Sequence, residues 1–194
     1  MVRRDIHVRR QCGFTITELL ATVALFSIVA AIGIPMVLGS LDGMKMGAAA
    51  RLVHGELQTA RLKAVSANRP IRVRFDCPAA GQFRMVELIG TPAVPDARDG
   101  AANRCSPTTY PYPVTNMNAL TRPNHDGPVR LLGTGVSFMA SQTVEFWPDG
   151  TAHANAGGGN PWPAIPGTGV IIMVKYKDSY KSITVNGVGK VQIQ

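Results

Sequence analysis

The chain has 194 residues, with 20 Lys and Arg, 12 Asp and Glu, three Cys and a formal net charge of +8. Hydrophobic residues make up 45% and charged residues 16%, so the chain is too apolar for a disordered tail and too poor in charge for a coiled coil. The cysteines form no CxxC pair and no Cys/His cluster, which excludes a disulfide-rich scaffold and argues against a structural zinc site.

The amino-terminal segment divides into a basic leader, residues 1–13, and a long apolar stretch. Residues 19–39 contain no charged side chain, and a helix of this length at about 1.5 Å per residue spans the roughly 30 Å core of a membrane. An ordinary secretory signal is cut after its apolar stretch, whereas the conspicuous Gly13-Phe14 junction lies before it. Cleavage there keeps the apolar helix, residues 14–39, on the mature protein.

Glu18 is an acidic residue near the start of this apolar stretch, where a buried charge requires a partner. Cleavage after Gly13 creates an α-amine on Phe14, and groups at positions i and i+4 of a helix face each other. In a staggered bundle, Glu18 would instead neutralise the amine of a neighbouring chain, which predicts a role in assembly. The alternative is a plain single-span anchor in which Glu18 has no function.

The sequence GFTITELL, residues 13–20, resembles the class III leader junction of type IV pilins and type II secretion pseudopilins. The resemblance implies that prepilin peptidase cuts between Gly13 and Phe14, that Phe14 becomes N-methylated, and that Glu18 acts in filament assembly with other pilins. Pro35 lies where pilin helices often kink, and it removes one backbone donor.

The basic leader also predicts the orientation of the chain. Arginines before the apolar stretch hold the amino end in the cytoplasm, so the region after residue 40 lies outside it. With the resemblance, this implies a single-pass protein of the bacterial inner membrane with its carboxy-terminal domain in the periplasm. After assembly the protein would belong to a pilus or pseudopilus.

An amphipathic helix is expected over residues 40–69, because apolar residues recur there at spacings of three and four. Together with the membrane segment it predicts one long helix from Phe14 to Ala67, which ends before Pro70 because a residue preceding proline avoids the helical conformation. Apolar and polar residues then alternate over 71–75, which predicts a strand with Arg72 and Arg74 on a solvent-exposed face.

Residues 70–194 are expected to form an antiparallel β domain, so the predicted fold class is α+β. Further strands are expected at 83–89, 129–132, 136–139, 143–147, 170–176, 182–185 and 190–193. Residues 90–127 and 156–169 lack periodicity and are rich in turn-forming residues, so both are expected to be loops. Long loops on a sheet are where partners usually bind.

Cys77 and Cys105 are the two cysteines that remain once Cys12 leaves with the leader. In an oxidising exported compartment we expect them to form a disulfide. It would close a loop of about 29 residues and contribute on the order of 3 kcal/mol. Two separate reduced cysteines are the alternative.

The carboxy-terminal half is similar to the GspH/FimT-type pilin domain, in the strand-Pro-Asp-Gly element at 144–150 and the closing hairpin at 182–191. The resemblance implies the pilin fold, a long helix packed on antiparallel sheets. It also implies a minor pilin, a structural subunit that primes assembly of a type IV pilus and supports adhesion, twitching motility or DNA uptake. A type II secretion pseudopilin of the GspH type is the alternative that the residues leave open.

No enzyme is expected, because the sequence has no HExxH, GxSxG, GxGxxG or P-loop motif. No cofactor and no metal site are expected either. The histidines, including His153, are far apart in sequence and are expected at the surface or in loops, and Asp96 and Asp99 are expected to be solvated turn residues.

A basic cluster near the carboxy terminus is a candidate DNA-binding surface. Removal of the leader lowers the net charge to +5. Part of the remaining positive charge comes from four lysines, Lys175, Lys177, Lys181 and Lys190, among which two tyrosines are placed. Lysine side chains bind the phosphates of a nucleic acid backbone, and tyrosine rings stack on its bases. A pilus-borne DNA-binding subunit for natural transformation is therefore a second alternative. Lysines that protect exposed strand edges explain the cluster equally well.

Overall fold

The computed structural model describes residues 13–115, 117, 123–155 and 159–194. A long helix, α1 (Ile16–Ala67), precedes all the strands and confirms the long amino-terminal helix predicted from the sequence. The chain divides into two units, one that ends at Leu41 and one from Asp42 to Gln194. The helix belongs to both units.

The first unit contains the apolar part of α1, which is long and apolar enough to cross a membrane and in which none of the described residues is buried. The hydroxyls of Thr22 and Ser27 donate to the carbonyls of Leu19 and Val23, each at 2.8 Å. These bonds satisfy two polar side chains within the helix itself, as an apolar environment requires. Because α1 is helical through Pro35, the helix does not unwind there, and a kink at this residue stays a prediction.

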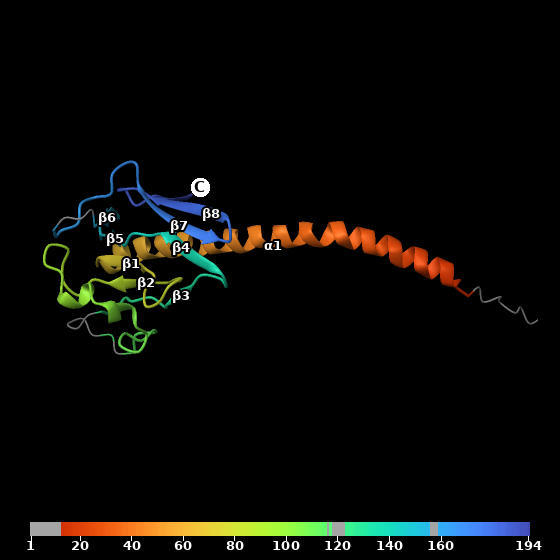
Figure 1. Ribbon diagram of the computed structural model, residues 1–194. Coiled ribbons are helices and arrows are strands. Elements are labelled where there is room, and N and C mark those ends of the chain that lie inside the picture. Colours follow the sequence, from red (N-terminus) through yellow and green to blue (C-terminus); the bar gives the residue numbers. More distant parts are fainter. Residues whose placement is uncertain (1–12, 116, 118–122, 156–158) are drawn as a thin grey trace, which may run out of the picture. The chain divides into compact units, whose positions relative to one another are not determined.

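The second unit contains two antiparallel sheets. The strands are β1 (Ile71–Phe75), β2 (Gln82–Glu87), β3 (Arg130–Leu131), β4 (Val136–Ala140), β5 (Val144–Phe146), β6 (Ala152–Ala154), β7 (Val170–Tyr176), β8 (Ser179–Val185) and β9 (Val191–Ile193). The larger sheet has the order β3-β2-β1-β5-β6 and the smaller sheet the order β4-β7-β8-β9. Figure 1 shows both beside the part of α1 that follows residue 42.

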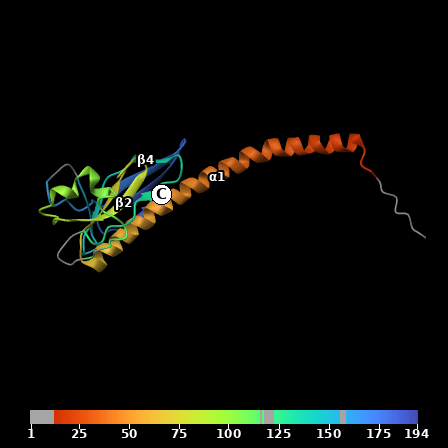
Figure 2. The same ribbon diagram turned by 90° about the horizontal axis from the view of Figure 1, so that it is seen from below.

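The core lies where this part of α1 meets both sheets, and Figure 2 shows β2 and β4 along the same stretch of helix. Small side chains on the helix, such as those of Ala60 and Ala64, are fully buried. They face fully buried residues of both sheets: Ile71, Val73, Phe83, Val144, Phe146, Ile172, Val174, Ile183 and Val185. Burial of this apolar surface is the main stabilising contribution to the second unit.

Two recognisable sequence elements, the strand-Pro-Asp-Gly turn and the closing hairpin, lie against each other. Gly189 has φ of 73°, and a Cβ there would lie 2.4 Å from the carbonyl oxygen of Gly150. The Nε of Arg61 on α1 donates to the same oxygen at 3.0 Å. Only glycine fits this close approach with a left-handed backbone.

The prediction that Arg72 lies on a solvent-exposed face of β1 is wrong. Arg72 is 5% exposed, and its Nε donates to Glu145 at 2.6 Å. The neighbouring Arg74 is half-buried and donates to the carbonyl of Ala101 at 2.8 Å. The long loop after β2 therefore folds over the polar face of β1, which a two-residue period does not reveal.

The structure also contains short elements that the sequence did not predict. β6 is a strand of three residues, Ala-His-Ala, without the β-branched residues that favour strands. Two short 3-10 helices, η1 (Ala97–Asp99) and η2 (Ala102–Cys105), lie in the region expected to be a structureless loop.

Candidate functional site

The junction at Gly13 and Phe14 lies directly before the start of α1. Both residues are exposed and non-helical. The backbone N–H of Glu18 donates to the hydroxyl of Thr15 at 3.2 Å. The backbone N–H of Leu19 donates to the carbonyl of Thr15 at 3.1 Å. Thr15 thus caps the helix. This cap fixes the first helical turn immediately after the junction and leaves the Gly13-Phe14 bond outside the helix, where a protease can reach it.

Glu18 lies in the first turn of α1 and is exposed. Negative charge is favoured at this end of a helix because the backbone N–H groups carry partial positive charge. The carboxylate makes no ion pair within the described residues. Glu18 is therefore available to a group outside this part of the chain.

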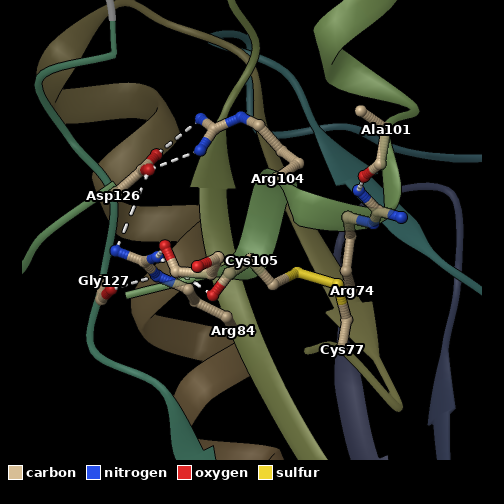
Figure 3. Close-up of a disulfide and its surroundings, with 9 residues drawn as sticks. Arg74, Cys77, Arg84, Ala101, Arg104, Cys105, Asp126 and Gly127 are labelled. Carbon is tan, nitrogen blue, oxygen red and sulfur yellow. Dashed lines mark hydrogen bonds and ion pairs between the residues drawn. A yellow bond between two sulfur atoms is a disulfide. The ribbon is translucent and has the colours of Figure 1, made fainter. Parts of the chain in front are cut away.

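Cys77 and Cys105 form a disulfide, with Cα atoms 5.6 Å apart. The bond is buried and joins the segment just after β1 to the end of η2 (Figure 3). It anchors the loop after β2 to the sheet.

Replacing both cysteines with alanine is expected to lower the free energy of unfolding by about 3 kcal/mol, because the unfolded chain regains the freedom that the closed loop removes. Chemical denaturation of the full chain in detergent, followed by tryptophan fluorescence, measures this loss. The wild type treated with reductant should match the double variant. An unchanged unfolding midpoint in both would contradict the expectation.

A buried ion pair joins the same loop to the residues before β3. Arg104 and Asp126 are 0% and 2% exposed, and both terminal nitrogens of Arg104 donate to the carboxylate, at 2.5 and 2.7 Å. The carboxylate also accepts the backbone N–H of Glu87 at 2.8 Å. Figure 3 shows Asp126 between Arg104 and Arg84.

Arg84 organises the surrounding backbone. Its side chain is fully buried, and it donates to the carbonyls of Gly127 and Tyr110, both at 2.7 Å, and of Cys105 at 3.2 Å. Burial lowers the pKa of Arg84, while the nearby Asp126 acts in the opposite direction. No local pattern in the sequence relates Arg84, Arg104 and Asp126, so the sequence alone does not reveal this cluster.

The four lysines of the predicted DNA-binding cluster do not share one surface. Lys175 pairs with Tyr180 and Lys181 with Val174 across the β7-β8 hairpin, so Lys175 and Lys181 lie on opposite faces of the sheet. Lys177, in the turn between these strands, forms an ion pair with Asp42, and its hydrogen bond lowers the pKa of Asp42.

Lys190 lies at the other end of the hairpin. Its backbone N–H donates to the side-chain oxygen of Asn186 at 2.9 Å. This contact is next to Val185 and Val191, which are paired across strands β8 and β9. Lys190 therefore lies apart from the other three lysines. DNA binding by this cluster stays a prediction.

The expected exposure of His153 and Asp99 is wrong. His153 is 7% exposed in β6, where its ring stacks 3.6 Å from that of Trp147. Asp99 is 3% exposed and accepts the backbone N–H groups of three residues of its own loop: Ile89, Gly90 and Asp96. Among the residues that the structure describes, no group of three or more His, Cys, Asp or Glu could hold a metal ion.

Comparison with solved structures gives distant similarities. The minor pseudopilin EpsH from the type 2 secretion system of Vibrio cholerae is 12% identical, with a TM-score of 0.43 over 77% of this chain and 96% of that chain. The type IV minor pilin FimU of Pseudomonas aeruginosa is 12% identical, with a TM-score of 0.41 over 76% of this chain and 91% of that chain. A second crystal form of FimU gives a TM-score of 0.43 over 77% and 87% of the two chains.

Comparison of sequences gives a specific match at the amino terminus. A search among curated proteins finds no match. Residues 8–34, which include Gly13, Phe14 and Glu18, match the family model of the prokaryotic N-terminal methylation motif. The chain therefore carries the N-terminal methylation motif of prepilin-type proteins at the start of a long helix that precedes two antiparallel sheets.

Proposed function

We propose that this chain is a minor pilin of the GspH/FimT type, a structural subunit of a type IV pilus. The observation that carries the proposal is the match of residues 8–34 to the methylation motif, together with an exposed Gly13-Phe14 bond directly before the capped start of α1. In this role prepilin peptidase removes residues 1–13, and Phe14 becomes the methylated first residue.

The exposed apolar side chains of the amino-terminal unit support a role in assembly. Phe14, Phe26 and Met36 are 76–80% exposed, and the large apolar side chains between them are exposed as well. Such a surface requires lipid or other apolar helices around it. The helix would hold the processed chain in the inner membrane, with residues 70–194 in the periplasm, and would then pack against the helices of other pilins in the filament.

The proposed task is mechanical rather than catalytic. A subunit of this kind would prime pilus assembly and would support adhesion, twitching motility or DNA uptake through the domain at its carboxy-terminal end. A pseudopilin of a type II secretion system has the same amino-terminal chemistry and is the competing proposal. The two differ in where the mature protein is found.

The amino-terminal sequence and intact mass of the protein, taken from membranes and from sheared surface filaments, test this proposal. We expect a mature chain that starts at methylated Phe14 and is present in sheared filaments. The same mature chain confined to the cell envelope would favour the secretion pseudopilus. A chain that is never cut at Gly13 would contradict both.

Replacing Glu18 with glutamine is expected to leave processing intact and to lower the amount of protein in sheared filaments about tenfold or more. A charge-assisted contact to the amine of Phe14 on a neighbouring subunit is lost, and about 1.4 kcal/mol corresponds to a factor of ten. Immunoblots of filament and envelope fractions measure the ratio. Glu18→Asp keeps the charge and should retain part of the incorporation, and wild-type incorporation of Glu18→Gln would exclude this role.

A further inference from the structure

A cleft of about 530 Å³ opens beside β1 in the second unit. We call it the arginine cleft, and its lining includes Arg72, Arg74, Ser141, Gln142, Thr143 and Trp162. Its volume lies within the usual range of ligand sites, about 300–1,000 Å³. Most of this lining can donate or accept hydrogen bonds. The proposed filament role uses none of these residues.

Arg72 is a fixed and neutralised part of the cleft wall. Its Nε donates to Glu145 at 2.6 Å, and its guanidinium lies 4.0 Å from the ring centroid of Trp162. Glu145 is itself 1% exposed and also accepts the indole N–H of Trp147 at 2.6 Å. The ion pair and the stacking contact hold Arg72 and Trp162 in place before any ligand arrives.

Arg74 is the charged group of the cleft without an acidic partner. Its described hydrogen bond is to the carbonyl of Ala101, at 2.8 Å, and Figure 3 shows this contact. Within the described residues, no carboxylate oxygen forms an ion pair with Arg74. Burial lowers the pKa of Arg74, and the positive charges of Arg104 and Arg72 add to this effect, while the negative charge of Asp99 opposes it more weakly. A negative charge placed here would offset that repulsion.

Asp99 also lines the cleft, but its carboxylate oxygens already accept three backbone N–H groups. Asp99 therefore holds its own loop in shape. Arg72 is paired with Glu145, and Asp99 acts on Arg74 only through space, so the guanidinium of Arg74 is the positive charge in the described part of the wall that forms no ion pair.

We propose that the arginine cleft binds the carboxylate of an Asp or Glu side chain presented by a partner protein, with Arg74 as its charged contact. A guanidinium has a planar fork of donors that matches a carboxylate. The hydroxyls of Ser141 and Thr143 supply hydrogen bonds for the amide groups beside such a side chain, and so does the side-chain oxygen of Gln142, whose nitrogen already donates to the carbonyl of Asn155. A single unmatched positive charge fits one carboxylate, whereas a nucleic acid backbone is bound by rows of cations.

The test is a titration of the full chain in detergent, with the tryptophan indole nitrogens labelled for NMR. Trp162 lines the cleft, and Trp147→Phe assigns its signal because the chain has two tryptophans. The probes are the capped tripeptides acetyl-Ala-Glu-Ala-amide and acetyl-Ala-Gln-Ala-amide. We expect a saturable shift of the Trp162 signal with the Glu peptide and about tenfold or more weaker binding of the Gln peptide.

Three variants separate binding at Arg74 from changes in folding. Arg74→Gln keeps a donor for Ala101 and should weaken binding of the Glu peptide about tenfold or more. Arg74→Lys keeps the charge without the fork and should bind with intermediate affinity. Arg51→Gln removes the same charge from an exposed position on α1 and should bind like the wild type.

Several outcomes would overturn the inference. These are the absence of a saturable shift, equal binding of the two peptides, and unchanged binding in Arg74→Gln. Inorganic phosphate or a double-stranded oligonucleotide that displaces the Glu peptide at lower concentration would show a general anion or nucleic acid site instead. Failure of these tests leaves the proposed filament role unaffected, since processing at Gly13 does not involve the cleft.

Discussion

Asp126→Asn is expected to lower the free energy of unfolding by about 3–5 kcal/mol, because it leaves the buried guanidinium of Arg104 without its carboxylate. Asp126 is 2% exposed and Arg104 is fully buried, so water cannot replace the lost charge. Both carboxylate oxygens accept hydrogen bonds from Arg104, whereas an amide offers one oxygen and turns a donor toward the arginine. Arg84, with its Nη2 atom 3.9 Å from the carboxylate, loses a nearby negative charge as well.

Chemical denaturation of the full chain in detergent, followed by tryptophan fluorescence, measures this loss. Asp96→Asn is the matched control, because the same chemical change breaks a solvent-accessible ion pair with Arg98 in the same loop, while asparagine can still cap η1 through the N–H of Arg98. Exposed pairs contribute little to stability, so this control should unfold like the wild type. Equal unfolding midpoints for the two variants would show that the buried pair does not hold the loop.

The helix and most strands follow from local patterns in the sequence. The predicted strands at 71–75 and 170–176 match β1 and β7 residue for residue, and α1 ends at the predicted Ala67. In each of these segments the spacing of apolar residues is itself the physical cause of the structure, because it places one face against the core. A pattern of that kind can be read without knowledge of the rest of the fold.

The buried polar contacts cannot be predicted in this way. Arg84, Arg104 and Asp126 are separated by 20 or more residues, and two of them lie outside any strand. Their burial depends on how a loop without periodicity folds over the sheet, which tertiary contacts alone decide. The disulfide could be predicted because that prediction needs only the number of cysteines and the expectation of an oxidising compartment.

The lysine cluster illustrates a different limit. Residues adjacent in sequence point to opposite faces of a strand, and the two ends of a hairpin with seven-residue strands lie far apart. Lys175, Lys181 and Lys190 are therefore close in the sequence without lying on one surface. Clustering of charge in a β segment is weak evidence for a binding surface unless the residues share a face.

Replacing Gly13 with leucine is expected to abolish cleavage of the leader and to remove the protein from sheared filaments. A Cβ at position 13 would meet no described atom within 4 Å, so the protein's own fold accommodates the larger side chain. Any loss must then arise in the peptidase, which requires the close approach to the backbone that glycine allows. Intact mass of the protein from membranes measures the outcome, since the uncut chain retains residues 1–13.

The control is Gly43→Ala, at another glycine where a Cβ meets no described atom within 4 Å. It should be cut and exported like the wild type, because it lies outside the junction. The tryptophan fluorescence of Gly13→Leu should report the same unfolding midpoint as the wild type, which separates loss of processing from loss of folding. Normal cleavage of Gly13→Leu would show that the peptidase does not read this glycine. Normal cleavage would still create the amine on Phe14, so it would leave the proposed contact with Glu18 in a filament untouched.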